Sequence, residues 1–387
     1  MQTDRVRQKV ALVVSSPMTA RFFLQDQIKE LALRYDLTVI ANHRDRSELG
    51  ALPEAMCTKS VDIRRKVEPL ADLRALFALW RIFRGSQFDI VHSVTPKAGL
   101  LSMLAGFAAR IPHRLHTFTG QVWATRRGLG RSVLRFLDTL IFRLSTLCFV
   151  DSRSQRDFLL REGVVTEQRS RVLADGSISG VDMQRFVLST DARQRIRANL
   201  GIADEAYVIL YLGRLNRDKG ILDLAQAVAG MPQGTVKTVL LLVGPDEGGI
   251  RELIEQMPNH DRSPILFVGF TDRPEDYMNA ADVFCLPSYR EGFGSVIVEA
   301  AAVGIPAIGS DIYGISDAIQ DGVTGKLYEA GNVIELRQAL EEFREDPLRR
   351  LEMGRCAHER AAQFFAKEVV TAALLQEYER LTSTPKR

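Results

Sequence analysis

Two loops in the second half of the chain combine glycines with charged side chains. The first reads GRLNRDKG, from Gly213 to Gly220, and follows the apolar run Val208–Leu212. Gly213 permits a sharp backbone turn, and Arg214 and Lys219 place two cations beside the predicted start of a helix. Helix N-termini favour phosphate, and arginine adds bidentate contacts to phosphate oxygens. The loop therefore predicts a phosphate site, and a solvated polar loop is the alternative for this motif taken alone.

The second loop, PSYREGFGSVIVEA, also follows a short apolar run and places Glu291 and Glu299 eight residues apart. Gly292 and Gly294 let the backbone approach a ligand closely, and Ser295 is the predicted N-cap of the next helix. A carboxylate in the first helical turn can simply interact with the helix dipole, which would explain Glu299 without a ligand. That explanation does not cover Glu291, which lies beside a Gly-Phe-Gly turn.

Short apolar runs alternate with helical patterns along the whole chain, which predicts parallel sheets covered on both faces. The predicted strands are Val10–Val14, Leu37–Ala41, Ile90–His92, Arg114–Thr117, Leu147–Val150, Val208–Leu212, Thr238–Val243, Ile265–Val268, Val283–Leu286 and Pro306–Gly309. The predicted helices include Ala20–Arg34, Pro69–Arg84, Pro96–Ala109, Gly130–Leu144, Ile221–Ala229, Ser295–Val303, Val333–Glu345 and Glu368–Leu381. Two Rossmann-like, doubly wound α/β domains in series fit this pattern, and ligands of such sheets bind outside the carboxyl ends of the strands.

The length of 387 residues suits two domains. A loop-rich stretch after Asp175 is the predicted linker, which gives one domain at 1–180, a second at 181–365, and a last helix in 366–387 that crosses back to the first. Residues 1–150 carry 23 Lys or Arg against 12 Asp or Glu, whereas the whole chain has a net charge of only +3. This asymmetry indicates an anionic partner for the first half, with nucleic acid, anionic lipid and a phosphorylated acceptor all open.

The pair GxLxxxKG and E-x7-E, in this order and about 70 residues apart, resembles the retaining glycosyltransferases of family 4. The resemblance covers the whole chain and implies the GT-B fold, in which two Rossmann-like domains face a central cleft. It implies transfer of a sugar from a nucleotide diphosphate donor, with UDP the expected nucleotide. An epimerase of the same fold that acts on UDP-sugars, and a non-catalytic protein that binds carbohydrate or nucleic acid, are the alternatives. The chain offers no evident aromatic platform for nucleic-acid bases.

The resemblance also implies roles for individual residues of the second half. Arg214 and Lys219 would bind the donor diphosphate, Glu299 the ribose, and Glu291 the transferred sugar. The remaining implied donor contacts are Gly213 in the first loop, the backbone of Gly292, Phe293 and Gly294, and, at the base, Gly269, Phe270 and Thr271. No Asp-x-Asp sequence occurs, so we expect neither a metal ion nor another cofactor.

The first half is expected to bind the acceptor. His116, at the end of the predicted strand Arg114–Thr117, is the implied catalytic histidine, and His92 is the competing candidate. Lys97, next to a helix start, and Ser16, in a loop without the glycines common in the family, are the expected acceptor contacts. No carboxylate in this half indicates a covalent nucleophile, so the resemblance implies a front-face mechanism without one.

Within the family, VHSVTPKAGLL, HTFTGQVW and GSISGVD are similar to the branch that glycosylates lipid-linked intermediates of bacterial surface glycans. Independently, Ser132–Thr146 predicts a basic amphipathic helix with Val133, Leu137, Leu140, Ile141 and Leu144 on its apolar face. Such a helix can lie on an anionic membrane or can pack on its own sheet. The polar start MQTDRVRQ predicts no signal peptide, and no apolar run has the length of a membrane span. We therefore expect a cytoplasmic enzyme, peripheral on the inner face of the cell membrane.

Overall fold

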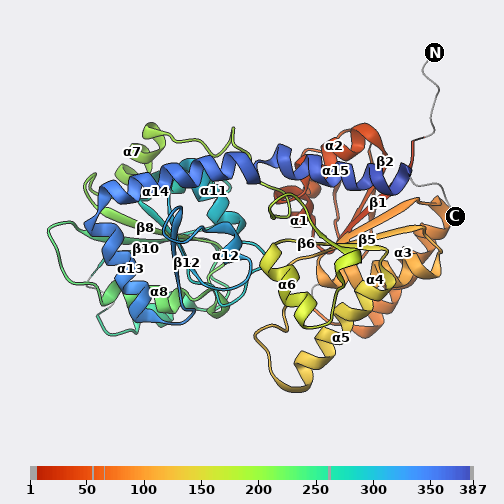
Figure 1. Cartoon of the computed structure of the whole chain (residues 1–387), viewed down its shortest axis with the longest axis horizontal. Coiled ribbons are helices and arrows are strands. Elements are labelled where there is room, and N and C mark those ends of the chain that lie inside the picture. The colour runs from red at the N-terminus through yellow and green to blue at the C-terminus, as the bar shows by residue number, and fades with distance from the viewer. Residues whose placement is uncertain (1–6, 55, 65, 260–262, 384–387) are drawn as a thin grey trace, which may run out of the picture. The chain divides into compact units, whose positions relative to one another are not determined.

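The computed structural model describes residues 7–54, 56–64, 66–259 and 263–383. The chain forms two compact units (Figure 1): the first runs to Ser179 and resumes at Lys367, and the second is Gly180–Ala366. Each unit contains one parallel sheet, of seven strands in the first unit and six in the second. The two sheets have the doubly wound architecture expected from the sequence.

The sheet of the first unit has the strand order β3-β2-β1-β4-β5-β6-β7. Its strands are β1 Lys9–Val14, β2 Asp36–Ala41, β3 Cys57–Ser60, β4 Ile90–Val94, β5 His113–Phe118, β6 Leu147–Val150 and β7 Ser170–Val172. Successive residues of β1 point to opposite faces, so Val10 and Leu12 join one buried cluster while Ala11 and Val13 join the other. The strand order reverses between β1 and β4, which places the switch point of this sheet there.

Helices cover both faces of this sheet. They are α1 Pro17–Phe22, α2 Gln25–Arg34, α3 Pro69–Ser86, α4 Pro96–Ala108, α5 Gly128–Leu144, α6 Arg153–Arg161 and α15 Lys367–Ser383. Figure 1 shows α2 and α15 on one side and α3, α4 and α5 on the other, in agreement with the two buried clusters. The last helix of the chain therefore completes the core of the first unit. No helix among the described residues is long and apolar enough to cross a membrane.

A buried histidine joins α15 to the sheet. His92 on β4 is 3% exposed, and its Nδ1 lies 2.8 Å from the hydroxyl of Tyr378 on α15. Its Nε2 lies 2.8 Å from Oγ1 of Thr117 on β5. Burial lowers the pKa of His92 to about 3, so the ring stays neutral at physiological pH. Both ring nitrogens thus form hydrogen bonds to neighbouring elements of the fold, which indicates a structural role for His92.

Replacing Tyr378 with phenylalanine should lower the free energy of unfolding by about 1–3 kcal/mol, because one nitrogen of His92 would be buried without a partner. Urea unfolding of the full chain, followed by hydrogen exchange of peptides from β4 and α15, measures the loss. The ring of Tyr35 lies 5.6 Å, centroid to centroid, from the ring of Tyr378. Tyr35→Phe is the matched control because it leaves His92 paired. Equal stability of Tyr378→Phe and Tyr35→Phe would contradict this role.

The second unit has the strand order β10-β9-β8-β11-β12-β13. Its strands are β8 Tyr207–Leu212, β9 Thr238–Val243, β10 Ile265–Gly269, β11 Val283–Leu286, β12 Ala307–Ser310 and β13 Gly325–Tyr328. The order reverses between β8 and β11, so the loops that follow these two strands flank the switch point. These are the two loops in which the sequence predicted a ligand-binding site.

The helices of the second unit are α7 Thr190–Asn199, α8 Ile221–Ala229, α9 Ile250–Glu255, α10 Pro274–Ala280, α11 Ser295–Val303, α12 Ile315–Ala318, α13 Val333–Glu345 and α14 Pro347–Arg360. In Figure 1, α8 and α13 lie on one side of the sheet and α7, α11 and α14 on the other. A short π-helix, Ala361–Phe365, follows α14. One continuous apolar cluster forms the core.

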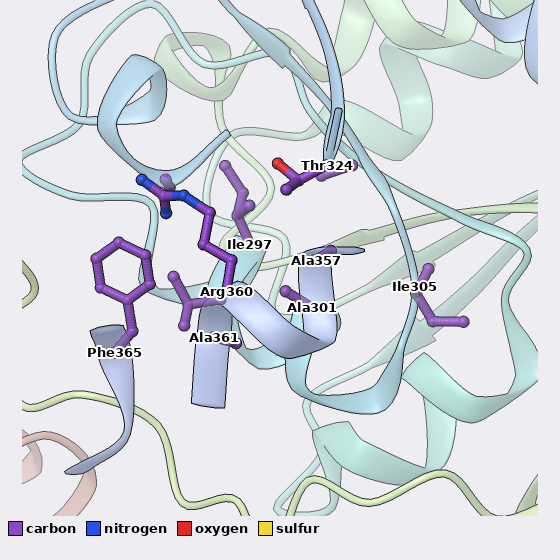
Figure 2. A pocket seen from close by; sticks show the side chains of 11 residues that line it. Ile297, Ala301, Ile305, Thr324, Ala357, Arg360, Ala361 and Phe365 are labelled. Atoms are coloured by element: carbon purple, nitrogen blue, oxygen red, sulfur yellow. The ribbon is translucent and has the colours of Figure 1, made fainter. Parts of the chain in front are cut away.

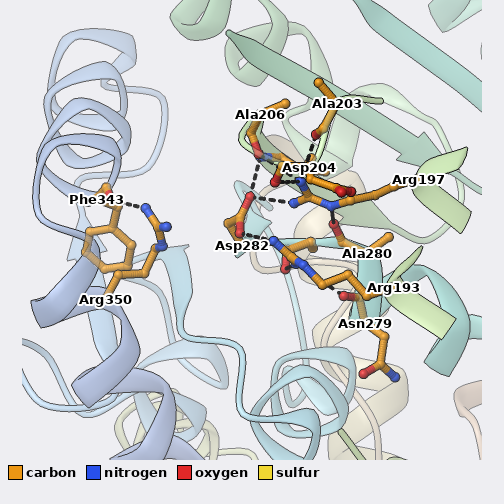
Figure 3. Close-up of polar contacts among 12 residues, drawn as sticks. Arg193, Arg197, Ala203, Asp204, Ala206, Asn279, Ala280, Asp282, Phe343 and Arg350 are labelled. Atoms are coloured by element: carbon orange, nitrogen blue, oxygen red, sulfur yellow. Dashed lines mark hydrogen bonds and ion pairs between the residues drawn. The ribbon is translucent and has the colours of Figure 1, made fainter. Parts of the chain in front are cut away.

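A buried arginine attaches α7 to this sheet (Figure 3). Arg197 is 1% exposed and donates from Nη2 to Oδ2 of Asp282, just before β11, over 2.8 Å. Its other nitrogens donate to the carbonyl oxygens of Ala203, Asp204, Ala206 and Ala280. Asp282 also receives Arg193 of α7, at 2.8 Å, so both of its oxygens are used. The network is saturated within the protein, which indicates a structural role.

Several predicted elements differ from the observed ones. The predicted helix Ala20–Arg34 is two helices, α1 and α2, and three strands were not predicted, namely β3, β7 and β13. The predicted N-cap Ser295 is wrong, because the cap is Gly294 and Ser295 is the first helical residue.

Candidate functional site

The loops after β8 and β11 touch each other at the switch point. Gly220 has a φ of 66°, and a Cβ at this position would lie 2.0 Å from the carbonyl oxygen of Pro287, so only glycine fits. The N–H of Tyr289 donates to the carbonyl oxygen of Asp218 over 3.0 Å. The two motifs, about 70 residues apart in the sequence, therefore form one site.

An ion pair joins the motifs through their side chains. Lys219 Nζ donates to Oε1 of Glu291, and the same oxygen accepts a 2.8 Å hydrogen bond from the hydroxyl of Ser288. The side chains of Lys219 and Glu291 are 20% and 15% exposed. An ammonium group has three N–H donors, so Lys219 can hold Glu291 in place and still donate to an anion.

A second source of positive charge lies at the start of α11. The backbone N–H groups of Gly292, Phe293 and Gly294 donate to no acceptor among the described residues. The turn is held in place because Gly314, with a φ of 86°, lets the next loop approach closely; a Cβ there would be 2.6 Å from the oxygen of Gly292. Unpaired N–H groups before a helix are suited to bind phosphate or sugar hydroxyl oxygens.

Glu299 lies on α11 behind this turn. Its carboxylate is partly buried and has no hydrogen bond or ion pair with the described residues. Burial raises the pKa of Glu299 to about 7, opposed by the more distant charge of Arg185. This carboxyl group has no partner and a pKa near neutral pH. Such a group is well suited to accept hydrogen bonds from the hydroxyls of a ligand.

Arg214 is held differently from Lys219. Its Nη1 donates to Oε2 of Glu247 over 2.8 Å, and its side chain is 42% exposed. The hydroxyl of Tyr211 fixes the loop backbone by donating to the carbonyl oxygen of Arg214 over 2.9 Å. Gly213, with a φ of 152°, permits the turn that leads out of β8. A surface pair of this kind contributes little energy, so an anionic ligand can replace Glu247 as the partner.

The predicted base-contact residues follow β10, the edge strand next to β9. Gly269 has a φ of 84°, and its carbonyl oxygen accepts the N–H of Gly244 over 2.7 Å. Phe270 is 62% exposed, and Oγ1 of Thr271 accepts the N–H of Arg273 over 3.0 Å. An exposed phenylalanine at the carboxyl edge of the sheet offers a face on which a base can stack.

The structure corrects the predicted position of His116. Strand β5 continues to Phe118, so His116 lies inside the strand, fully buried, and the residues at the strand end are Thr119 and Gly120. The ring packs against Gly99 of α4, where a Cβ would come within 2.3 Å of it. Burial, together with nearby His92, lowers the pKa of His116 to about 3. The ring therefore has no solvent-accessible surface in this structure.

The ring of His116 has one satisfied and one unsatisfied nitrogen. Its Nδ1 lies 2.9 Å from the hydroxyl of Ser93, whereas Nε2 is buried without a partner among the described residues. The catalytic assignment of His116 stays a prediction, and its neutral ring can act only as a hydrogen-bonding group near neutral pH.

The two predicted acceptor contacts both have protein partners. Lys97, on the first turn of α4, forms a 2.5 Å ion pair with Asp72 and also donates to the carbonyl oxygen of Lys66. Ser16 caps α1, with its side chain accepting the N–H of Met18 over 3.3 Å. Both residues therefore have structural functions, and their binding of an acceptor stays a prediction.

Two residues at the carboxyl edge of the first sheet were not singled out by the sequence. Thr95, after β4, has the strained φ of 80° and lies 3.0 Å, Oγ1 to Oγ, from Ser15 after β1, directly at the switch point. Asp151, after β6, is 5% exposed, and burial raises its pKa to about 8. No pattern in the sequence shows the strain of Thr95 or the burial of Asp151.

The apolar residues of α5 lie on two different sides of the helix, one buried and one exposed. Ile141 is buried and Leu144 packs against the core, so these residues face the sheet. The exposed apolar residues are Leu129, Val133 and Phe136, which are 86%, 56% and 62% exposed. The helix thus packs on its own sheet and also presents a second apolar stripe to solvent.

Within the described part of the chain, no three His, Cys, Asp or Glu side chains are grouped so that they could hold a metal ion. Lys219, Arg214 and the unpaired backbone N–H groups supply positive charge at the switch point of the second sheet.

Comparison with known proteins identifies the fold and the family. The structure of HepE from Anabaena in complex with UDP and glucose superimposes with a TM-score of 0.81 at 20% identity, covering 96% of this chain and all of that one. The fold is that of the GT-B glycosyltransferases. A family model described as "Glycosyl transferases group 1" matches residues 192–360, and one described as "Glycosyl transferase 4-like domain" matches residues 20–176. The chain belongs to glycosyltransferase family 4 and is a glycosyltransferase.

Two relatives are similar over most of their length. The capsular polysaccharide biosynthesis glycosyltransferase CapM of Staphylococcus aureus is 27% identical over 82% of this chain and 83% of CapM. An Escherichia coli enzyme, UDP-Gal:alpha-D-GlcNAc-diphosphoundecaprenol alpha-1,3-galactosyltransferase, is 24% identical over 76% of both chains.

Proposed function

We propose that the protein transfers a sugar from a UDP-sugar to a lipid-linked sugar acceptor during bacterial surface polysaccharide synthesis, with retention of anomeric configuration. The observation that carries this proposal is the contact between the loops after β8 and β11, at the switch point of the second sheet. There Lys219 and three unpaired N–H groups lie on two loops that contact each other, and the unpartnered carboxylate of Glu299 lies on α11, directly after the second loop. Cations and N–H groups for a diphosphate, with a carboxylate for a diol, match the two polar parts of a nucleotide sugar.

In this proposal each group has a defined task. Lys219, Arg214 and the N–H groups of the turn hold the diphosphate and stabilise the negative charge that develops when it leaves. Glu299 accepts hydrogen bonds from the ribose, and Glu291 from the transferred sugar. The acceptor hydroxyl bonds to the anomeric carbon as the bond to the phosphate oxygen breaks, on the same face, and the hydroxyl proton passes to that oxygen.

The relatives support the nature of the two substrates. HepE binds UDP and glucose, and the E. coli relative is named for a UDP-sugar donor and a diphosphoundecaprenol acceptor. We assign the donor to the second unit and the acceptor to the first. The exposed stripe Leu129, Val133 and Phe136, with Arg126 and Arg127 before it, would place the first unit on the inner face of the cell membrane.

The proposal is tested by offering a panel of labelled UDP- and GDP-sugars to the protein together with bacterial membranes, and by measuring label in the organic-extractable lipid fraction. Label from one UDP-sugar should enter the lipid fraction, and none should enter with heat-treated protein. Label that appears only in a water-soluble product would overturn the lipid-linked acceptor, and label from GDP-sugars alone would overturn the choice of UDP.

The pKa of Glu299 predicts a pH dependence of donor binding. Below about pH 7 the carboxyl group is protonated in the free protein, and above it the carboxylate is the better acceptor for ribose hydroxyls. The affinity for a UDP-sugar should therefore rise as the pH increases from about 6 to about 8. Binding in this range should release a proton, which calorimetry in buffers of different ionisation enthalpy measures. Glu299→Gln should bind more weakly and without this pH dependence; a dependence that persists in the variant would exclude Glu299 as its source.

A further inference from the structure

Helix α3 of the first unit has two apolar faces. The inner face, with Ala75, Leu79 and Phe83, belongs to the buried cluster. On the outside, Leu70, Leu73 and Phe77 are 76%, 63% and 60% exposed. Their spacing of three and four residues places them on one stripe of the helix. No role in sugar transfer is assigned to this outer stripe.

A groove runs along the outer side of α3. It has a volume of about 930 Å³ and lies between the helix and β3, the edge strand of the sheet. Its lining is Lys59, Leu73, Arg74, Phe77, Ala78, Arg81, Ile82, Gly85 and Ser86. Gly85 has no atom within 4 Å of the place where a Cβ would stand, so the groove is open at that end of the helix.

The cations of the groove lack acidic partners. The side chains of Arg74 and Arg81 are exposed and form no ion pair or hydrogen bond with the described residues. Among the residues that the structure describes, Nζ of Lys59 donates only to a neutral group, the hydroxyl of Ser86, over 3.2 Å. Positive charge therefore stands unneutralised along an apolar surface.

Three carboxylates on α3 or in the segment before it are already paired with other cations. Asp72, the only acidic residue of α3, is paired with Lys97 over 2.5 Å. Asp62 and Glu68 are both paired with Arg64, over 2.9 Å and 2.5 Å. These three acids therefore do not neutralise the cations of the groove.

From these contacts we infer that the α3 groove binds anionic phospholipid of a membrane surface. Leu70, Leu73 and Phe77 contact the acyl region, while Arg74 and Arg81 bind headgroup phosphates. The exposed apolar stripe matches the acyl chains of an anionic lipid, and the cations beside the stripe match its headgroup. A second copy of this chain is disfavoured because the same arginines would face each other across a two-fold contact.

The α3 groove is a different surface from the exposed stripe of α5. The inference rests on the proposed membrane contact of the first unit, but it does not depend on sugar transfer. The full-length protein is sedimented with vesicles of equal parts phosphatidylglycerol and phosphatidylcholine, and with vesicles of phosphatidylcholine alone, without any nucleotide sugar. We expect binding to the anionic vesicles only. Arg74→Gln and Arg81→Gln should each weaken it by about fivefold, since one cation near an anionic surface contributes about 1 kcal/mol. Phe77→Ser should weaken binding to a similar or greater extent.

Matched controls lie on other helices of the same unit. Arg161→Gln on α6 removes an exposed arginine, and Leu33→Ser on α2 removes a leucine that is 66% exposed. Both should bind vesicles like the wild type. Equal losses in control and α3 variants, or unchanged binding in the α3 variants, would overturn the inference. A dimer in sedimentation velocity that Phe77→Ser dissociates, without an effect on vesicle binding, would overturn it in favour of a second copy.

The result can be separated from the proposed function. Vesicle binding that depends on α3, with no label transferred from any donor, would overturn the proposed function and leave the lipid site intact. Transfer into the lipid fraction with vesicle binding that is insensitive to α3 would overturn the lipid site alone.

Discussion

The variant Lys219→Ala should transfer sugar about 100- to 1000-fold more slowly than the wild type, the usual effect of removing one group that stabilises a developing anion. The Nζ of Lys219 is fixed by Glu291, so its position is set before the donor binds. Because the charge on the diphosphate grows as the sugar leaves, kcat should fall more than the donor KM rises. Steady-state transfer from the UDP-sugar that labels lipid measures both constants.

Arg217→Ala is the matched control for this prediction. Arg217 lies two residues earlier in the same short 3-10 helix, is exposed, and has no side-chain partner among the described residues. Its loss should change kcat by less than about threefold, as expected for a solvated charge. A kcat of Lys219→Ala within the same range would exclude Lys219 from transition-state stabilisation.

The partnership of Lys219 and Glu291 makes a further test possible. Because the two side chains form one ion pair, their separate losses should not add. Lys219→Ala combined with Glu291→Ala should be scarcely slower than the slower single variant. Fully additive losses would mean that the ion pair does not couple the diphosphate contact of Lys219 to the sugar contact of Glu291.

The largest effect on stability is expected for Arg197→Ala, which should lower the free energy of unfolding of the second unit by about 3–5 kcal/mol. The substitution removes a cation that is 1% exposed and leaves four carbonyl oxygens and one oxygen of Asp282 without this donor. Urea unfolding read out by hydrogen exchange of peptides from α7 and β11 assigns the loss to this unit.

Arg195→Ala provides the comparison on the same helix. Arg195 pairs with Asp276 over 3.0 Å, but its side chain is 50% exposed. Surface pairs contribute at most about 1 kcal/mol, so the variant should be nearly as stable as the wild type. A similar loss in both variants would indicate that α7 is sensitive to any substitution rather than to the loss of the buried arginine.

A small enclosed gap lies beside α11. Figure 2 shows the side chains that line it, among them Ile297, Ala301, Ala357 and Phe365. Its cavity volume of about 10 Å³ holds roughly one water molecule. It is a packing gap between α11 and α14, where Gly354 allows close contact with the backbone of Gly304.

The sequence predicted the central strands of both sheets and missed strands at the edges. The missed strands β3, β7 and β13 each end a sheet. An edge strand is covered less completely than a central one, so CTKS, SRV and GKLY lack the continuous apolar run that identifies buried parallel strands. The break between α1 and α2, at Phe23 and Leu24, contains neither glycine nor proline, so no helix-breaking residue marks it.

The part of the candidate site that lies in the two sequence motifs was predictable. Glycines, cations and carboxylates at strand ends indicated both loops of the second sheet, because such sheets bind ligands at that edge. The pairing of Lys219 with Glu291 depends on the strand order, which periodicity does not show. His116 was misplaced because the strand boundary was set one residue too early and burial under α4 depends on Gly99, a tertiary contact.

The return of α15 to the first unit has a consequence for synthesis on the ribosome. The sheet of that unit is translated first, yet Val370, Leu374 and Tyr378 of its core come after the whole second unit, about 190 residues later. At ~5–20 residues per second this delay is about 10–40 s. Throughout this interval α1 and α2 cover part of that face of the nascent sheet and the rest stays exposed, so chaperones that hold apolar surface should bind the nascent chain until its last helix leaves the exit tunnel.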